Sequence, residues 1–415
     1  MKKIYVLLLV LSMNLFYNVL KAQQGWTIYD NTNSPLLSGT YSTIAIDQNG
    51  NIWTGGSYTG LFKYDGSNWS NYSTFNSNIL YDEINKILVD NSNHIWAANY
   101  KGVSVFNGSS FTNYDTLNAA FKGYTVYALG KDNNGVIWLS SKNGSFGYQG
   151  ITTFNGSTWT NLTGYPSQID GREFTDFAFT SSNDAWIACE NGFVKYTSSS
   201  FSFYPEVVTG LWSSTAVAID ANSNIWTGGF DGLLKYDGSS WTMKDNVADM
   251  GLPSNTYYYD ILPVGNILWI ATTAGLLKYD RNNGTVLANY KSTNSPLADN
   301  CVTQIAKDAS GKLWLSTTIG IVKMDPSQVG ISEYDDMPGF SIYPNPSKGI
   351  IHMVNQGQKE FSFKIYSVDG TLIKSVKENK QNYTLDMTEY PEGVYYIQIM
   401  ANGKLLTRKL VLSGN

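Results

Sequence analysis

Few residues of this chain have the chemistry of an enzyme's active site. Its two histidines are His94 and His352, and its two cysteines, Cys189 and Cys301, stand in apolar, strand-like runs. Such cysteines are typical of small buried thiols rather than of a redox pair. The sequence also lacks a serine nucleophile elbow, a phosphate-binding loop and an HExxH zinc motif. We therefore predict no catalytic residue, no metal ion and no cofactor.

Carboxylates are the other groups that could act. Five aspartates stand six residues before a tryptophan: Asp47, Asp90, Asp132, Asp220 and Asp308. The D-x-N-x-N pattern that begins at Asp47 invites a calcium site, but no acidic residue follows at the twelfth position, so an Asx turn explains the spacing better. Glycoside hydrolysis would need two acids about 5–10 Å apart. Glu173 with Asp176, or Glu190 with Asp231, would be such pairs, and nothing in the sequence selects either.

Aromatic residues offer a binding chemistry instead. The chain has 29 tyrosines, 12 tryptophans and 18 phenylalanines beside many small polar residues, a composition typical of a rigid extracellular β protein. Aromatic planes with carboxylates and amides among them suit sugar rings or an extended peptide. The residues that we predict to bind such a ligand are Tyr58, Tyr100, Tyr148, Arg172, Glu190, Asn191, Trp212, Phe230, Asp231 and Tyr257. They can act together only if the fold brings their loops to one surface.

An internal repeat indicates which elements carry these loops. The segment IWTGGFDGLLKYDGSSWT at 225–242 is a near-copy of IWTGGSYTGLFKYDGSNWS at 52–70. Equivalent tryptophans recur at intervals of 40 to 48 residues: Trp53, Trp96, Trp138, Trp186, Trp226, Trp269 and Trp314. This period, with its short alternating apolar runs, is that of a four-stranded propeller blade. The second residue after each tryptophan is always small, which would let neighbouring blades approach closely.

The two ends of the repeat array predict how the ring closes. The last copy stops after GIVKMD at 320–325, without an outer strand. The missing strand is present at the other end, because QGWTIYDNTNSPL at 24–36 resembles VLANYKSTNSPL at 286–297. We therefore predict an all-β chain whose residues 23–328 form a seven-bladed β-propeller. Its N-terminal strand, at 26–30, would pair beside 319–325 and close the ring.

The repeat also carries a family resemblance. IWTGGFDGLLKYDGSSWT, preceded by AIDANSN, resembles the two-component regulator propeller repeat over residues 24–326. In that family the repeats often form the periplasmic sensor of a membrane-bound histidine kinase. This chain shows no transmembrane or kinase segment, so the resemblance implies the fold and not a signalling role.

Strands that run alternately up and down place the loops of each blade on two faces. The turns between first and second strands and between third and fourth strands are short and repetitive, such as QNGN and DGSN, and His94 lies among them. The loops between second and third strands and the blade-to-blade connections vary, and we call the surface that they form the loop face. Variable loops on a rigid scaffold are where binding is expected. This face holds all ten predicted residues, with further candidates at Tyr81, Asp82, Glu83, Lys101, Tyr124, Lys142, Glu173, Tyr258 and Tyr259.

Both ends of the chain indicate export. Residues 1–22 have the Lys2-Lys3 start, apolar core and small final residue of a secretory signal peptide. A membrane anchor is the alternative, and the apolar run is short for one. After an acidic, turn-rich linker at 329–339, residues 340–415 alternate apolar and polar residues around Asp369-Gly370 and Asn402-Gly403, which predicts an Ig-like β-sandwich.

The segments YPNPSKG, IYSVDG, EGVYYIQI and RKLVL resemble, in that order, the C-terminal sorting domain of type IX secretion cargo in Bacteroidota. The resemblance implies export to the outer surface, followed by attachment or release; a plain binding sandwich is the alternative. A net charge of −5 without a basic run speaks against nucleic acid and anionic membrane as partners. The leading interpretation is therefore a secreted or surface-displayed propeller that binds carbohydrate or peptide without catalysis. The alternatives are an accessory component of the type IX machinery and a polysaccharide lyase or hydrolase.

Overall fold

The computed structural model describes residues 25–143, 149–169, 172–197, 200–230, 232–329, 340–345, 347–355, 361–367, 371–378, 382–401 and 404–413. The chain divides into two compact units, Met1–Gly330 and Ile331–Asn415. The predicted signal peptide and most of the predicted linker lie outside the described residues. Each unit is described below by itself.

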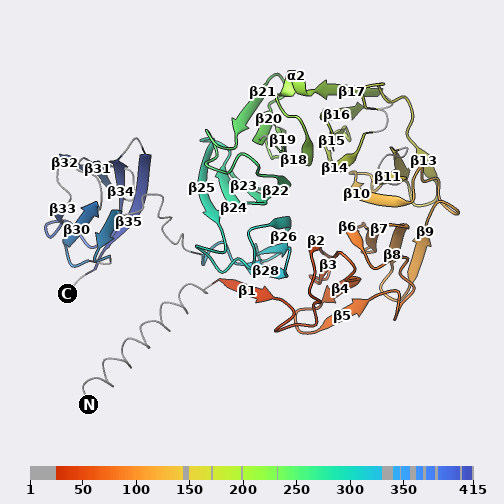
Figure 1. Ribbon diagram of the computed structural model, residues 1–415, viewed down its shortest axis with the longest axis horizontal. Helices are drawn as coiled ribbons and strands as arrows, with labels where there is room; N and C mark the ends of the chain where they lie inside the picture. Colours follow the sequence, from red (N-terminus) through yellow and green to blue (C-terminus); the bar gives the residue numbers. More distant parts are fainter. Residues whose placement is uncertain are drawn as a thin grey trace, which may run out of the picture. The chain divides into compact units, whose positions relative to one another are not determined.

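Within the described residues, the first unit contains seven four-stranded antiparallel sheets arranged around one axis (Figure 1). We number these blades in chain order. Blade 1 holds β2 (Tyr41–Ile46), β3 (Ile52–Gly56), β4 (Leu61–Tyr64) and β5 (Trp69–Tyr72); blade 2 holds β6 (Ile84–Val89), β7 (Ile95–Asn99), β8 (Gly102–Phe106) and β9 (Phe111–Tyr114); blade 3 holds β10 (Thr125–Lys131), β11 (Ile137–Lys142), β12 (Gln149–Phe154) and β13 (Trp159–Asn161); blade 4 holds β14 (Phe174–Phe179), β15 (Ala185–Cys189), β16 (Gly192–Thr197) and β17 (Ser200–Pro205).

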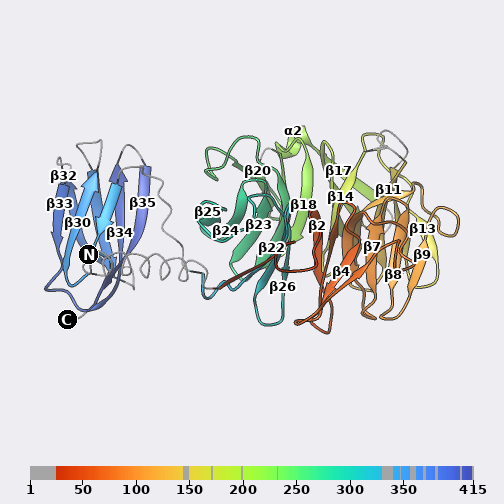
Figure 2. The ribbon, with the colours of Figure 1, turned by 60° about the horizontal axis from the view of Figure 1, so that its bottom comes forward.

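The remaining blades follow the same order. Blade 5 holds β18 (Ser214–Ile219), β19 (Ile225–Gly229), β20 (Gly232–Tyr236) and β21 (Trp241–Asp245); blade 6 holds β22 (Tyr258–Val264), β23 (Ile267–Thr272), β24 (Gly275–Asp280) and β25 (Thr285–Tyr290); blade 7 holds β26 (Val302–Lys307), β27 (Leu313–Thr317), β28 (Ile321–Met324) and β1 (Trp26–Tyr29). A one-turn helix, α2 (Glu206–Thr209), lies between blades 4 and 5. In Figure 2 the strands run between two opposite faces of the propeller, where the connecting loops lie.

The N-terminal strand closes the ring, as the sequence predicted. β1 pairs antiparallel with β28, with Trp26 opposite Met324 and Tyr29 opposite Ile321. Gly320, which stands six residues after Trp314, explains why this edge accepts the strand. A Cβ atom at Gly320 would lie 2.4 Å from the Tyr29 carbonyl oxygen. Gly102 and Gly275 approach the outer strands of blades 2 and 6 in the same way, so β1 takes the place of an ordinary outer strand.

The connection after the closing strand repeats that after β25. Asn33 donates to the Ile28 carbonyl at 3.0 Å and accepts from the Asp30 N–H at 3.1 Å. Asn294 does the same, donating to the Asn289 carbonyl at 2.9 Å and accepting from the Lys291 N–H at 2.7 Å. A side-chain amide that bonds main-chain groups on both sides fixes a tight turn. The likeness of NTNSPL to STNSPL therefore reflects one type of blade-to-blade connection, which Asn76 and Asn118 also anchor after blades 1 and 2.

The repeated tryptophans and small residues pack the blades together. Trp53, Trp226 and Trp314 are 2–3% exposed. At the small position two residues after a tryptophan, a Cβ atom on Gly228 would lie 2.6 Å from the Tyr258 Cβ of the next blade. The close approach predicted for this position is thus confirmed.

The aspartates before the tryptophans cap turns, as the Asx-turn interpretation predicted. Asp47 accepts from the N–H groups of Asn49 and Asn51, both at 2.9 Å. Its second oxygen accepts from the Trp53 indole N–H at 3.0 Å, a bond that the sequence did not reveal. The same indole bond recurs from Trp96 to Asp90, from Trp226 to Asp220 and from Trp314 to Asp308, at 2.9–3.1 Å.

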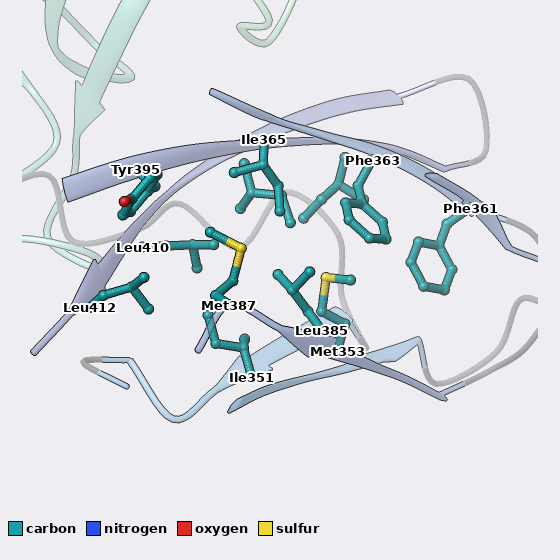
Figure 3. Packing of buried hydrophobic residues seen from close by; sticks show 12 residues of the cluster. Ile351, Met353, Phe361, Phe363, Ile365, Leu385, Met387, Tyr395, Leu410 and Leu412 are labelled. Carbon is teal, nitrogen blue, oxygen red and sulfur yellow. The ribbon is translucent and has the colours of Figure 1, made fainter. Parts of the chain in front are cut away.

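The second unit is the predicted Ig-like β-sandwich. One sheet has the order β29 (Phe340–Tyr343), β30 (Ile350–Asn355), β33 (Asn382–Asp386), and the other β32 (Leu372–Glu378), β31 (Phe361–Ser367), β34 (Gly393–Ala401), β35 (Lys404–Leu412). Figure 3 shows Ile351, Met353 and Leu385 of the first sheet facing Phe363 and Ile365 of the second. The predicted turns at 369–370 and 402–403 lie outside the described residues.

Candidate functional site

Eight of the ten predicted binding residues lie in the described part of the chain, and Tyr148 and Asp231 lie outside it. The described ones fall into three groups on the loop face. Two groups are aromatic and one is polar. The inner strands of the blades begin on this face, and we call its part nearest the axis the mouth.

The first aromatic cluster joins blades 1, 2 and 3. Tyr58, 71% exposed, lies close to Tyr81, Tyr100 and Glu83, and the carboxylate of Glu83 raises the pKa of the Tyr58 hydroxyl. The ring of Tyr100 lies 6.0 Å from that of Tyr81 and 6.3 Å from that of Tyr127, measured between ring centres. Tyr58 and Tyr100 thus meet, together with Tyr127, which the sequence did not single out. Because ring pairs at these spacings attract, the cluster holds its exposed rings in place.

A lysine connects this cluster to blade 4. The Lys142 ammonium lies 4.3 Å from the centre of the Tyr127 ring and forms an ion pair with Glu173. Burial lowers the pKa of Lys142, against the opposing charge of Glu190. Glu173 is therefore already paired with a cation and is not a free carboxylate.

The polar group lies in blade 4. The guanidinium of Arg172 donates to the side-chain amide oxygen of Asn191 in the favourable orientation of that amide, and its Nε donates to the Gln168 carbonyl. Glu190 forms a β-bridge with Ser213, next to Trp212. Arg172, Glu190 and Asn191 are thus brought together between the two aromatic clusters.

The second aromatic cluster joins blades 5 and 6. Trp212, 52% exposed, lies edge-on to Phe230 with ring centres 6.5 Å apart. Phe230 lies 5.0 Å from Tyr257, and Tyr257 stacks with Tyr259 at 6.5 Å. The three predicted residues of this region are therefore contiguous. Tyr258 is not part of the surface, because strand alternation buries it completely.

A buried asparagine supports the second cluster. Asn246 donates to the carbonyls of Phe230 (2.9 Å), Ser254 (3.4 Å) and Thr256 (3.3 Å) and accepts from the Tyr258 hydroxyl at 2.8 Å. These bonds tie the connection before Tyr257 to the loop that carries Phe230. A buried amide with its groups satisfied rigidifies its surroundings. No sequence pattern predicts this role, because the bonds of Asn246 reach both its own connection and the separate loop that carries Phe230.

Three charged residues from alternate blades meet at the axis. The Lys86 ammonium of blade 2 lies 3.5 Å from a carboxylate oxygen of Asp176 in blade 4. Burial raises the pKa of Asp260 in blade 6 to about 6, although the positive charge of Lys86 opposes this shift. Burial also acts to lower the pKa of Lys86, but the two carboxylates outweigh it and raise that pKa. The carboxylates also accept from the main-chain N–H groups of the next blades, Asp176 from Val217 at 3.1 Å and Asp260 from Ile305 at 2.8 Å.

The groups considered for catalysis are spread over different surroundings. His94 contacts Asp90 at 3.1 Å in a turn opposite the loop face, and His352 lies in the sandwich, 3.3 Å from Thr384. Glu173 and Asp176 pair with different lysines, as described above. Among the described residues, no group of three or more histidine, cysteine, aspartate or glutamate side chains could hold a metal ion. Cys189 and Cys301 are both free thiols, and Cys189 is buried.

The sequence of the tail matches a known family, and the fold of the chain matches solved structures. Residues 341–413 match the secretion system C-terminal sorting domain. No curated protein matches the sequence. In the described residues, no helix is long and apolar enough to cross a membrane.

The structural matches are distant in sequence. PorZ, an essential bacterial surface component of the type IX secretion system of Porphyromonas gingivalis, matches with a TM-score of 0.60 at 17% identity, over 90% of this chain and 59% of that one. The extracellular domain of BT3049 from B. thetaiotaomicron, assigned to a hybrid two-component system, matches with a TM-score of 0.63 at 13% identity, over 94% and 57%. Virginiamycin B lyase from Staphylococcus aureus matches with a TM-score of 0.58 at 12% identity, over 72% and 98%.

These identities establish the fold alone, and this chain spans less than two thirds of the first two of these proteins. The sorting domain adds the destination, because a protein that carries it is exported. The chain is therefore a β-propeller protein that carries a type IX secretion system C-terminal sorting domain and is secreted to the cell surface, and its propeller is similar in fold to PorZ and to the extracellular domain of BT3049.

Proposed function

We propose that the loop face of the propeller binds a carbohydrate or peptide ligand, without catalysis, once the protein has reached the cell surface. The observation that carries this proposal is the grouping of exposed aromatic rings into two ordered clusters around the mouth. Trp212 and Tyr257 in one cluster and Tyr58 and Tyr100 in the other keep 38–71% of their surface exposed. Large exposed aromatic groups on a rigid scaffold mark interaction sites.

The surrounding polar groups suit a binding role. Lys142 forms an ion pair with Glu173, and Arg172 donates to the neutral amide of Asn191, so these side chains are already engaged. A general acid or base needs a free titratable group within reach of the substrate. The paired state of these side chains therefore favours binding over chemistry.

The proposal is tested with glycan and peptide arrays probed with the purified secreted protein. We expect binding to one ligand class, and we expect Trp212→Ala and Tyr100→Ala each to weaken it at least tenfold. Phe75→Ala is the matched control, because Phe75 is 98% exposed and belongs to neither cluster. A blank result on both arrays would remove the proposal.

A second candidate is an accessory role in the type IX secretion machinery. It is favoured by the structural match to PorZ, which is described as an essential component of that machinery. Deleting the gene separates the two candidates. An accessory protein is needed for other proteins with sorting domains to reach the surface, whereas a cargo that binds a ligand is not.

A further inference from the structure

The inner strands of the propeller share a feature that the sequence did not reveal. Each of the seven inner strands that the structure describes contains a β-bulge of one residue near its start, at the mouth. The bulge residues are Ser42, Asn85, Tyr127, Thr175, Thr215, Tyr259 and Thr303. A bulge turns one side chain out of the regular alternation, and such positions are common beside functional sites.

Five of these residues have the same task. Each donates a side-chain hydrogen bond to a main-chain carbonyl of the next blade: Ser42 to Ile84 (2.7 Å), Asn85 to Val126 (2.8 Å), Thr175 to Ser214 (3.0 Å), Thr215 to Tyr258, and Thr303 to Tyr41 (2.7 Å). The last of these bonds joins blade 7 to blade 1. Together they bridge five of the seven junctions between neighbouring blades, and each bond is donated by a small hydroxyl or amide side chain.

Tyr127 and Tyr259 depart from this rule. Among the described residues, neither donates a bond of this kind to the next blade. Tyr127 instead packs edge-on against Tyr100, with ring centres 6.3 Å apart, and lies under the Lys142 ammonium, in the first aromatic cluster. Tyr259 stacks with Tyr257 in the second. The bulges of blades 3 and 6 thus place an aromatic ring at the mouth instead of this donor, and in blade 3 Ser140 donates to the Phe174 carbonyl of blade 4 at 2.7 Å in its place. Such local exceptions are expected at functional sites.

The two exceptions lie across the axis from each other. Figure 1 shows their strands, β10 and β22, on opposite sides of the ring. Of the charged residues at the axis, Lys86 and Asp176 come from the two blades beside that of Tyr127, and Asp260 follows Tyr259 on its own strand. The arrangement is therefore a polar centre with an aromatic ring on either side.

We propose that Tyr127 and Tyr259 are ligand-binding residues, and that the ligand is an uncharged saccharide chain that crosses the mouth from one aromatic cluster to the other. This inference rests on the proposed function and narrows it to one ligand class. Sugar rings would stack on Tyr259 and Tyr257 at one end and on Tyr127 and Tyr100 at the other. The polar groups at the centre would accept and donate hydrogen bonds to the sugar hydroxyls between them.

The charges at the mouth favour a saccharide over a peptide. The cations described there are already engaged: Lys86 with Asp176, Lys142 with Glu173, Arg172 with Asn191, and Lys101 over the Tyr81 ring at 5.3 Å. An uncharged ligand needs no free cation, so these existing contacts do not weaken its binding. Extended peptides are commonly held by main-chain bonds to a free strand edge. At the mouth the blades present bulges and loops, and their inner strands are joined by the side-chain bonds described above.

The residues found at the other bulges indicate which substitutions to test. Tyr127→Thr and Tyr259→Thr install the residue found at three other bulges, so the folded propeller should tolerate them. We expect each to weaken saccharide binding at least tenfold while the melting temperature stays the same or rises. Thr303→Ala is the matched control at the same ring position, and it should lower the melting temperature without changing binding.

The measurement is calorimetric titration of the full secreted protein with neutral hexasaccharides of glucose, mannose or N-acetylglucosamine, beside uncharged hexapeptides. Saccharide binding that is lost in both tyrosine variants supports the inference. Binding of peptides alone, or saccharide binding that both variants retain, would overturn it and leave the proposed function standing. A protein that binds neither class would overturn both.

Discussion

At the scale of single residues, the tryptophan of a blade and the aspartate six positions before it form one structural unit. The sequence predicted both positions, because each recurs with a fixed spacing. It did not predict that the Asp47 carboxylate accepts from the Trp53 indole, because that bond appears only when the strand pair folds back on the turn. One carboxylate therefore caps a turn and orients the ring that packs against the next blade. Both carboxylate oxygens of Asp47 already accept hydrogen bonds from the protein, which gives the calcium-like pattern that begins at Asp47 a structural role.

The charges at the axis could not be predicted in the same way. Lys86, Asp176 and Asp260 belong to three different repeats, and nothing near them in the sequence distinguishes them from surface residues. They meet because the ring brings equivalent positions of alternate blades to one point. The same reasoning applies to Tyr127, whose exceptional character shows only against the other bulges.

Asp260 makes the stability of the propeller depend on pH. Burial raises the pKa of Asp260 from 3.8 to about 6, so the folded chain holds this proton more tightly than the unfolded chain does. Its contribution to the free energy of unfolding is therefore complete below about pH 4 and is lost as the pH rises through about 6. Asp260→Asn, which stays neutral, should be more stable than the wild type at pH 7.5, by on the order of 1 kcal/mol. The difference in stability between Asp260→Asn and the wild type should disappear towards pH 4.

Thermal unfolding between pH 4 and pH 8 measures this effect. Asp176→Asn is the control, because Asp176 carries the ion pair with Lys86 and its loss should destabilise the protein at neutral pH. If the melting temperatures of the wild type and of Asp260→Asn change in parallel with pH, Asp260 is not the source of the pH dependence.

At the scale of elements, the closing strand was predictable because it is a displaced copy of a repeat. The missing outer strand after 325 and the likeness of 24–36 to 286–297 were both visible in the sequence. The structure adds the reason that the edge fits, which is the absence of a side chain at Gly320. Of the loop-face residues in the two clusters, all but Tyr127 were predicted, but their division into clusters was not. Which rings meet depends on loop anchors such as Asn246, which joins the loop that carries Phe230 to the connection before Tyr257.

Gly320→Ala should loosen the closing strand. The added Cβ atom would lie 2.4 Å from the Tyr29 carbonyl oxygen, which is main chain and cannot move without β1. We expect a loss of about 1–3 kcal/mol, as for other overpacked sites. Thermal unfolding measures the loss, and limited proteolysis should show early cleavage after β1.

Gly150→Ala is the matched control within a blade. Its added Cβ atom would lie 2.8 Å from Cδ of Lys122, which belongs to a flexible side chain that can move aside and not to the main chain. If Gly320→Ala melts like the wild type and resists cleavage at its N-terminus, then β1 does not hold the ring closed.

At the scale of the whole molecule, the proposed binding surface and the sorting domain belong to different compact units. The propeller core and the sandwich core are each built from their own residues: the cluster around Ile351 and Phe363 is confined to the tail, and the closing strand completes the propeller without it. Each unit should therefore keep its property when the other is altered. The proposed loop-face variants leave the sorting domain untouched, so they should be exported like the wild type.

Removal of residues 340–415 should separate the two properties. We expect the truncated protein to keep the melting temperature of the propeller but to remain inside the cell, because the matched sorting domain at 341–413 is gone. Cell fractionation, with protease treatment of intact cells, measures this. Tyr127→Thr with Tyr259→Thr in the full chain is the converse control, since it should reach the surface and fail to bind saccharide. A truncated protein that still appears on the surface would show that export depends on the propeller, and the division of labour between the two units would then be wrong.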